Sequence, residues 1–148
     1  MNSRTYNDRL TVIIVSFHSN QIIENLINVI EKNIKVLVIE NSLDKKLKID
    51  LEKKFENVQV IIPIKNLGNG AGINLGFSLV KTEFSLYLDV DTVPDKDMIN
   101  ILLENTKKIK NFSMLAPKAQ NFNYGEDLYI RSRSRQRASV AGSCRCFK

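Results

Sequence analysis

Short apolar runs alternate along the chain with longer segments whose apolar residues recur every three or four positions. The runs are rich in β-branched residues, which is typical of strands buried on both faces, and they predict strands at 10–15, 36–39, 58–62, 84–88 and 112–116. The helical period predicts helices over 20–32 and 44–56, one from the glycine-rich stretch 66–72 to about residue 81, and one starting near Pro94. Because strand and helix alternate through residue 116, the sequence predicts an α/β fold, a mainly parallel sheet with helices on both faces.

The composition is that of an ordinary globular domain. The chain has 148 residues, of which 43% are hydrophobic and 26% are charged. No apolar run reaches the ~18 residues of a membrane span, and the apolar run behind the polar segment 1–9 is short for a signal peptide. We therefore expect a cytoplasmic protein, and leave open peripheral attachment at the cytoplasmic face of a membrane.

The net charge of +6 is confined to the end of the chain. Residues 1–130 hold all 16 acidic residues, matched by 14 Lys and 2 Arg, so the excess lies in the basic segment 131–148. That segment has no apolar periodicity, and we expect it to be a disordered tail joined to a domain at 10–118 by a connecting segment, 119–130. The tail could bind RNA or anionic lipid, although the sharp change in composition favours a shifted reading frame or an abrupt truncation. Cys144 and Cys146 are too close for a structural disulfide, and they have no Cys or His partners for a zinc site.

Polar clusters follow four of the predicted strands, at 16–19, 40–42, 65–68 and 89–91. Ligands of open parallel sheets bind beyond the carboxyl ends of the strands, so these clusters should meet at one rim. Asp89 and Asp91 offer oxygen ligands that suit Mg²⁺ or Mn²⁺ beside a diphosphate. An Asp-x-Asp is often only a solvated turn, but its place at the end of a buried strand favours a site.

Two further features leave their alternatives open. Gly68, Gly70 and Gly72 either form a loop leading into a helix or let the backbone approach a phosphate or ribose. They match neither a Walker sequence nor a dinucleotide fingerprint. His18, the only histidine, could act as a base, but a local hydrogen bond is commoner for a histidine without a nucleophile motif.

Together these pieces resemble family 2 glycosyltransferases of the GT-A fold. The resemblance rests on four segments in order, Val12 to Ser19, Val36 to Ser42, Asn66 to Gly76 and Leu86 to Pro94, and it covers about residues 10–118. The third segment resembles a glycine-asparagine signature of the rhamnosyltransferase-like members. The resemblance implies the nucleotide-binding half of that fold, with a Rossmann-like sheet and a divalent metal, Mn²⁺ or Mg²⁺.

The resemblance also implies a donor site for a nucleotide-diphosphate sugar. In that site Phe17 packs on the nucleobase, and Glu40, where the family usually has Asp, bonds to the base. The implied site comprises Phe17, Glu40, Asn66, Gly72, Asn74 and Asp89 for the nucleotide sugar, with Asp89 near the ribose, and Asp91 as the metal ligand.

Family members continue into a region that binds the acceptor and supplies an acidic catalytic base. That region is expected to be missing here, as in a chain truncated at its C-terminal side, and Glu126-Asp127 falls too soon after Asp91 to take the role. The resemblance implies inverting, metal-assisted transfer to a glycan or lipid-linked acceptor in the synthesis of a surface polysaccharide. The alternatives are a nucleotide-sugar-binding module without turnover, or a protein that acts on RNA or a membrane through its basic tail. Of these partners, nucleic acid is the least favoured.

Overall fold

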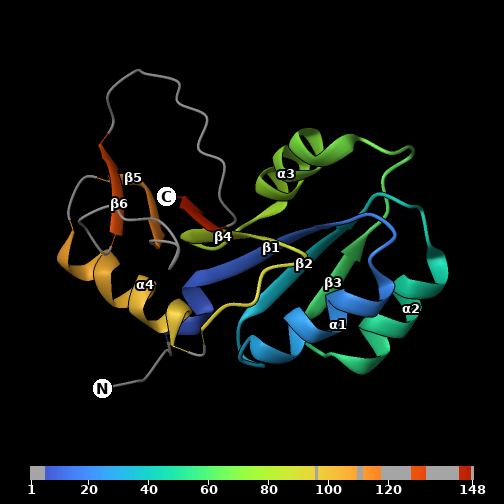
Figure 1. Cartoon of the computed structure of the whole chain (residues 1–148), viewed down its shortest axis with the longest axis horizontal. Coiled ribbons are helices and arrows are strands. Elements are labelled where there is room, and N and C mark those ends of the chain that lie inside the picture. The colour runs from blue at the N-terminus through green and yellow to red at the C-terminus, as the bar shows by residue number, and fades with distance from the viewer. Residues whose placement is uncertain (1–5, 96, 110–111, 118–127, 133–143, 148) are drawn as a thin grey trace.

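The computed structural model describes residues 6–95, 97–109, 112–117, 128–132 and 144–147 (Figure 1). Its strands form one seven-stranded sheet in the order β3-β2-β1-β4-β7-β5-β6. In chain order the strands are β1 (Leu10–Ser16), β2 (Lys35–Glu40), β3 (Val58–Ile61), β4 (Phe84–Asp89), β5 (Phe112–Pro117), β6 (Leu128–Ser132) and β7 (Cys144–Phe147). The helices are η1 (Tyr6–Arg9, a 3₁₀ turn), α1 (Asn20–Val29), α2 (Lys45–Lys54), α3 (Gly68–Leu79) and α4 (Met98–Lys108).

The first four strands confirm the predicted fold class. β3, β2, β1 and β4 are parallel neighbours, and helices cover both faces of this Rossmann-like sheet (Figure 1). One apolar cluster lies under α1, α2 and α4, and a smaller one, which includes Ile13, Val15 and Tyr87, lies under α3. The carboxyl ends of the parallel strands therefore meet at one rim, as the sequence predicted.

The last helix begins later than the sequence predicted. We expected it to start near Pro94, but α4 begins at Met98. The Asp95 side chain accepts a hydrogen bond from the backbone N–H of Asp97 at 3.1 Å, which makes a local turn before the helix. A side chain that bonds to its own nearby backbone delays the helix in this way.

Two strands lie in the part of the chain expected to be disordered. The expectation is wrong for residues 131–132, which end β6, and for residues 144–147, which form β7. β7 is antiparallel to both β4 and β5, and β6 is antiparallel to β5. These pairings are long-range backbone contacts, which hydrophobic periodicity does not detect, and residues 133–143 lie outside the described part. In the described part, the longest helix has 12 residues, and none is long and apolar enough to cross a membrane.

α2 lies beside β3, the outermost strand at one end of the described sheet. The Lys48 ammonium donates to the Val60 carbonyl at 2.5 Å, and the Val60 N–H donates to Glu52 Oε1 at 2.8 Å. Lys48 and Glu52 are one helical turn apart and form an ion pair at 3.2 Å. The helix thus bonds to both backbone groups of Val60.

Asp44 caps the start of α2 and should make the stability of this helix pH-dependent. Hydrogen bonds from the Leu47 N–H at 3.0 Å and the Asn20 amide at 2.9 Å lower the pKa of the Asp44 carboxyl from its ordinary value of 3.8. Because the pKa is lower in the folded state, the stabilisation is present above pH 3.8 and is lost as the pH falls through 3.8 towards the folded-state pKa.

We expect Asp44→Ala to lower the free energy of unfolding at pH 7, and the difference from the parent chain to shrink near pH 3. Urea unfolding at both pH values measures this. Asp44→Asn is the matched control, since asparagine keeps a capping oxygen that does not titrate in this range. An equal loss for Asp44→Ala at both pH values would rule out an ionised cap.

Candidate functional site

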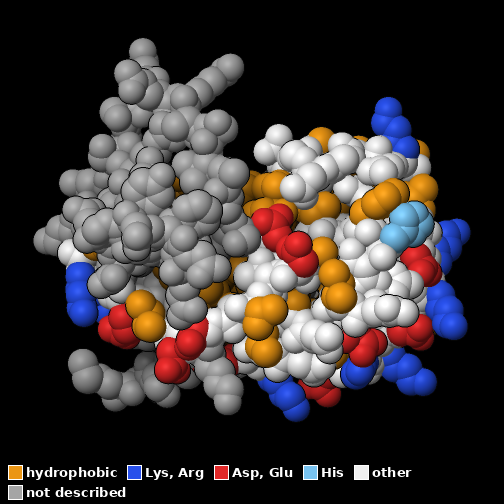
Figure 2. Space-filling model, in the orientation of Figure 1, with side chains coloured by type: hydrophobic (Ala, Val, Ile, Leu, Met, Phe, Trp, Pro, Cys, Tyr) orange, Lys and Arg blue, Asp and Glu red, His pale blue; other side chains and the backbone are white. Residues whose placement is uncertain are grey.

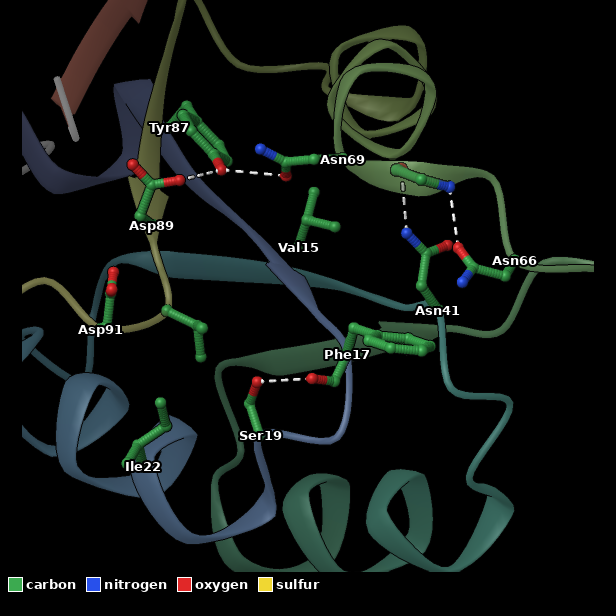
Figure 3. Close-up of a pocket in the computed structure, with 12 residues that line it drawn as sticks. Val15, Phe17, Ser19, Ile22, Asn41, Asn66, Asn69, Tyr87, Asp89 and Asp91 are labelled. Carbon is green, nitrogen blue, oxygen red and sulfur yellow. Dashed lines mark hydrogen bonds between the residues drawn. The ribbon is translucent and has the colours of Figure 1, made fainter. Parts of the chain in front are cut away.

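A cavity of about 450 Å³ opens at the carboxyl ends of β1, β2 and β4, beside the start of α3 (Figure 3). Its lining residues are Val15, Phe17, Ser19, Ile22, Asn41, Asn66, Gly68, Asn69, Tyr87, Asp89, Val90 and Asp91. The only charged side chains among them are the two carboxylates. On the face in Figure 2, Lys and Arg side chains lie around the periphery, away from the acidic side chains near the centre.

The two carboxylates belong to the end of β4 and the turn behind it. Asp89 is the last residue of the strand and is half-buried, whereas Asp91 is exposed. The Thr92 N–H donates to the Asp89 carbonyl at 2.9 Å and closes the turn that redirects the chain. The Tyr87 hydroxyl donates to Asp89 Oδ1, so among the described residues Asp89 Oδ2 and both Asp91 oxygens remain available for a ligand.

These two carboxylates fit a divalent cation that is also coordinated by a bound molecule. Mg²⁺ and Mn²⁺ accept one or two protein carboxylates and complete their coordination with phosphate oxygens and water. No group of three or more His, Cys, Asp or Glu side chains in the described part could hold a metal ion by itself. At this cavity the described residues can therefore supply two ligands, and they leave the other coordination positions open.

Phe17 lies just beyond β1 and is half-exposed, with 52% of the surface of the residue accessible. The Ser19 hydroxyl donates to the Phe17 carbonyl at 3.0 Å, and the His18 ring lies 4.3 Å from the Phe17 ring. His18 has φ of 51°, a left-handed conformation that is uncommon for a residue other than glycine. His18 is exposed and does not line the cavity.

Asn41 and Asn66 hold the backbone where the chain enters α3. Asn41 donates to the Gly68 carbonyl at 3.0 Å and accepts from the Leu67 N–H at 3.3 Å, and Asn66 Oδ1 accepts from the Gly68 N–H at 2.7 Å. Gly68 has φ of 71°, which explains the glycine at this position. The glycine-rich stretch is thus a tight, side-chain-bonded start of a helix at the wall of the cavity (Figure 3).

Four of the predicted site residues line the cavity, namely Phe17, Asn66, Asp89 and Asp91. Three others, Glu40, Gly72 and Asn74, are not among its lining residues.

Alternation along β2 places Glu40 on the same face as Val36 and Val38, under α1 and α2. The Glu40 side chain is fully buried, and its Oε1 accepts hydrogen bonds from the Ser42 N–H at 2.7 Å and from the Ser42 hydroxyl. Glu40 Oε2 has no hydrogen-bond partner in the described part.

The other two lie on α3 and do not line the cavity. Asn74 is exposed. Gly72 packs under the helix, where an added Cβ would lie 3.1 Å from Val15 Cγ1 and 3.2 Å from Asn41 Nδ2. Gly72 therefore supports two lining residues and does not itself face the cavity.

Four polar lining residues were not among the implied site residues, namely Ser19, Asn41, Asn69 and Tyr87, although Ser19 and Asn41 belong to the polar clusters 16–19 and 40–42. Tyr87 precedes Asp89 by two positions, and this spacing in a strand places both side chains on one face. Asn69 lies within the glycine-rich stretch, and Asn41 directly follows Glu40. The sequence signals that could have identified these residues are the two-residue spacing of Tyr87 from Asp89 and the adjacency of the asparagines to residues already singled out.

Solved glycosyltransferase structures share this fold. The mannosyltransferase PcManGT from Pyrobaculum calidifontis, solved in complex with GDP-Man and Mn²⁺, is 16% identical, with a TM-score of 0.60 over 74% of this chain and 35% of that protein. TarS from S. aureus, residues 1–349, is 22% identical, with a TM-score of 0.61 over 80% of this chain and 38% of that structure. The chain therefore spans little more than a third of these relatives, and at these identities the likeness shows the fold alone. No curated protein sequence matches the chain significantly.

A comparison with sequence models of protein families identifies the family, and the match covers nearly the whole chain. A family model described as glycosyl transferase family 2 matches residues 11–140. The match starts at β1 and extends past residue 118, into the connecting segment and the basic segment that were predicted to lie outside the domain. The chain belongs to glycosyl transferase family 2.

Proposed function

We propose that the chain binds a nucleotide-diphosphate sugar together with a divalent cation and takes part in transferring the sugar to a glycan or lipid-linked acceptor. The observation that supports this most is the cavity itself. Asp89 and Asp91 lie at its wall, and none of its described lining residues is a Lys or Arg.

The charges favour a cation that enters with the nucleotide. A diphosphate that approached two carboxylates without a counterion would be repelled at short range. A divalent ion between the carboxylates and the diphosphate removes this repulsion and, when bound, stabilises the charge of the departing nucleoside diphosphate. We assign Asp91 and Asp89 Oδ2 as the ligands that the chain supplies. The Mn²⁺ and GDP-Man in PcManGT are a precedent in a protein of the same fold.

The remaining lining groups suit a nucleoside and a sugar. The exposed face of Phe17 offers a surface on which a base can stack. Asn66, Asn69 and Ser19 present amide and hydroxyl groups that match ribose and sugar hydroxyls. A contact between Glu40 and the base stays a prediction, and it would require Glu40 to exchange its bonds to Ser42 for the base.

For transfer with inversion, a base would take the proton of the acceptor hydroxyl, which attacks the anomeric carbon as the diphosphate leaves. Both acidic residues among the described lining residues are assigned to the cation, so none is left there for this base. That observation favours a second candidate function, a module that binds the nucleotide sugar without turnover.

Titration of a nucleoside diphosphate panel (UDP, GDP, CDP, ADP, dTDP), with and without Mn²⁺, tests the proposal. We expect at least one nucleotide to bind more tightly, by about tenfold or more, with Mn²⁺. Donor hydrolysis or transfer, assayed on the same samples, separates the two candidates. Turnover supports the transferase, and metal-dependent binding without turnover supports the binding module. If no nucleotide binds with or without Mn²⁺, both candidates are wrong.

A further inference from the structure

Tyr87 has a buried ring and a hydroxyl at the cavity wall. Its side chain is 5% exposed and packs in the apolar cluster with Ile13, Val15, Leu37 and Ile39. Because Tyr87 and Asp89 are two residues apart on β4, both side chains point to the face covered by α3. The packed ring has few alternative rotamers, so it holds the hydroxyl oxygen beside the Asp89 carboxylate (Figure 3).

The hydroxyl of Tyr87 lies between two acceptor oxygens. It donates to Asp89 Oδ1, and Asn69 Oδ1 lies 3.2 Å away. A phenol has one proton to donate, and an ionised carboxylate is a stronger acceptor than an amide oxygen. The proton therefore favours Asp89 while this carboxylate carries its full negative charge.

We infer that Tyr87 is a positioning residue for the cation site, through its hydrogen bonds to Asp89 and to Asn69 at the start of α3. This inference rests on the proposed function. By occupying Oδ1, the hydroxyl fixes the orientation of the Asp89 carboxylate and leaves Oδ2 as its oxygen for a cation. Without the hydroxyl, Asp89 gains rotational freedom that must be lost again when a cation binds.

The same hydroxyl links the cation to the helix. A cation on Asp89 draws electron density from the carboxylate and makes Oδ1 a weaker acceptor. The hydroxyl proton then shifts towards Asn69 Oδ1, and Asn69 belongs to the first turn of α3 and lines the cavity. Binding of the cation is thereby communicated to a side chain that faces the nucleotide sugar.

Tyr87→Phe tests the inference, because it removes the hydroxyl and keeps the buried ring. Mn²⁺ is titrated into the chain at a fixed concentration of the nucleoside diphosphate that the parent chain binds best. We expect the half-saturating Mn²⁺ concentration to rise about three- to tenfold, as for loss of one typical hydrogen bond. Saturating Mn²⁺ should restore the affinity of the parent chain for the nucleotide. The control is Ser78→Ala, which removes a hydroxyl near the far end of α3 that donates to the Leu75 carbonyl and does not line the cavity.

Two results would overturn the inference. One is an unchanged Mn²⁺ midpoint in a Tyr87→Phe chain that melts like the parent. The other is an affinity for the nucleotide that is reduced equally at every Mn²⁺ concentration, which indicates a general structural effect.

NMR of the parent chain gives a measurement that does not need the variant to fold. At a nucleotide concentration that saturates the parent chain with and without Mg²⁺, the Asn69 side-chain amide resonance of the parent chain should shift when Mg²⁺ is added. An Asn69 resonance that does not respond in the parent chain contradicts the link to α3. A parent chain that shows no metal-dependent nucleotide binding contradicts the proposed function, and this result differs from every outcome that contradicts Tyr87 alone.

Discussion

Asp91→Ala should abolish the enhancement of nucleotide binding by Mn²⁺. Asp91 is exposed at the cavity wall and is the proposed metal ligand with both oxygens available. Removing a residue that only orients a metal ligand lowers metal affinity by about 10- to 100-fold. Removing a ligand itself should lower the metal affinity at least as much. Calorimetric titration of the nucleoside diphosphate at several Mn²⁺ concentrations measures the effect.

Asp97→Ala is the matched control. It also removes an exposed carboxylate, but Asp97 lies at the start of α4, makes no side-chain capping bond and does not line the cavity. We expect this variant to keep the Mn²⁺ dependence of the parent chain. Retained Mn²⁺ enhancement in Asp91→Ala would show that the assigned ligand is wrong, and loss of it in both variants would indicate a diffuse effect of charge.

Gly76→Ala should destabilise the fold, although alanine is the better helix former. An added Cβ at Gly76 would lie 2.5 Å from Ile13 Cγ2, and Ile13 is fully buried in the centre of the sheet. Overpacking of this kind costs about 1–3 kcal/mol, whereas the change from glycine to alanine gains at most about 1 kcal/mol of helix propensity. The net loss should be up to about 2 kcal/mol in the free energy of unfolding, measured by urea denaturation.

Gly70→Ala, in the same helix, is the control that separates the steric contact with Ile13 from the gain in helix propensity. Nothing lies within 4 Å of a Cβ placed at Gly70, so only the gain in propensity remains. This variant should be as stable as the parent or more stable, by up to about 1 kcal/mol. Equal destabilisation by both substitutions would mean that the contact with Ile13 is not the cause.

The parallel half of the fold could be predicted because its signals are local. β1 and β2 are continuous runs of β-branched and other apolar residues, and their observed bounds, Leu10–Ser16 and Lys35–Glu40, extend the predicted ones by one residue or two. The rim that carries Phe17 and Asp89 then followed from the rule that ligands bind at the carboxyl ends of parallel strands.

Other features depend on contacts that the sequence does not display. β7 is a strand because β4 and β5 lie on its two sides, and no pattern within residues 144–147 indicates this. The resemblance implied that Glu40 bonds to the base; its side chain is buried and bonded to Ser42, and its contact with the base stays a prediction. The resemblance implied that Gly72 lines the nucleotide-sugar site, whereas its proximity to Val15 and Asn41 comes from helix packing.

The bonds between α2 and Val60 have a consequence for how copies of this protein meet. An outer strand with free N–H and C=O groups is a template on which a strand of another molecule can pair, which is a common route to aggregation. At the centre of β3 both groups of Val60 are already bonded, to Glu52 and to Lys48. An incoming strand would have to break two hydrogen bonds and displace an ion pair, so this edge of the sheet is protected from intermolecular growth.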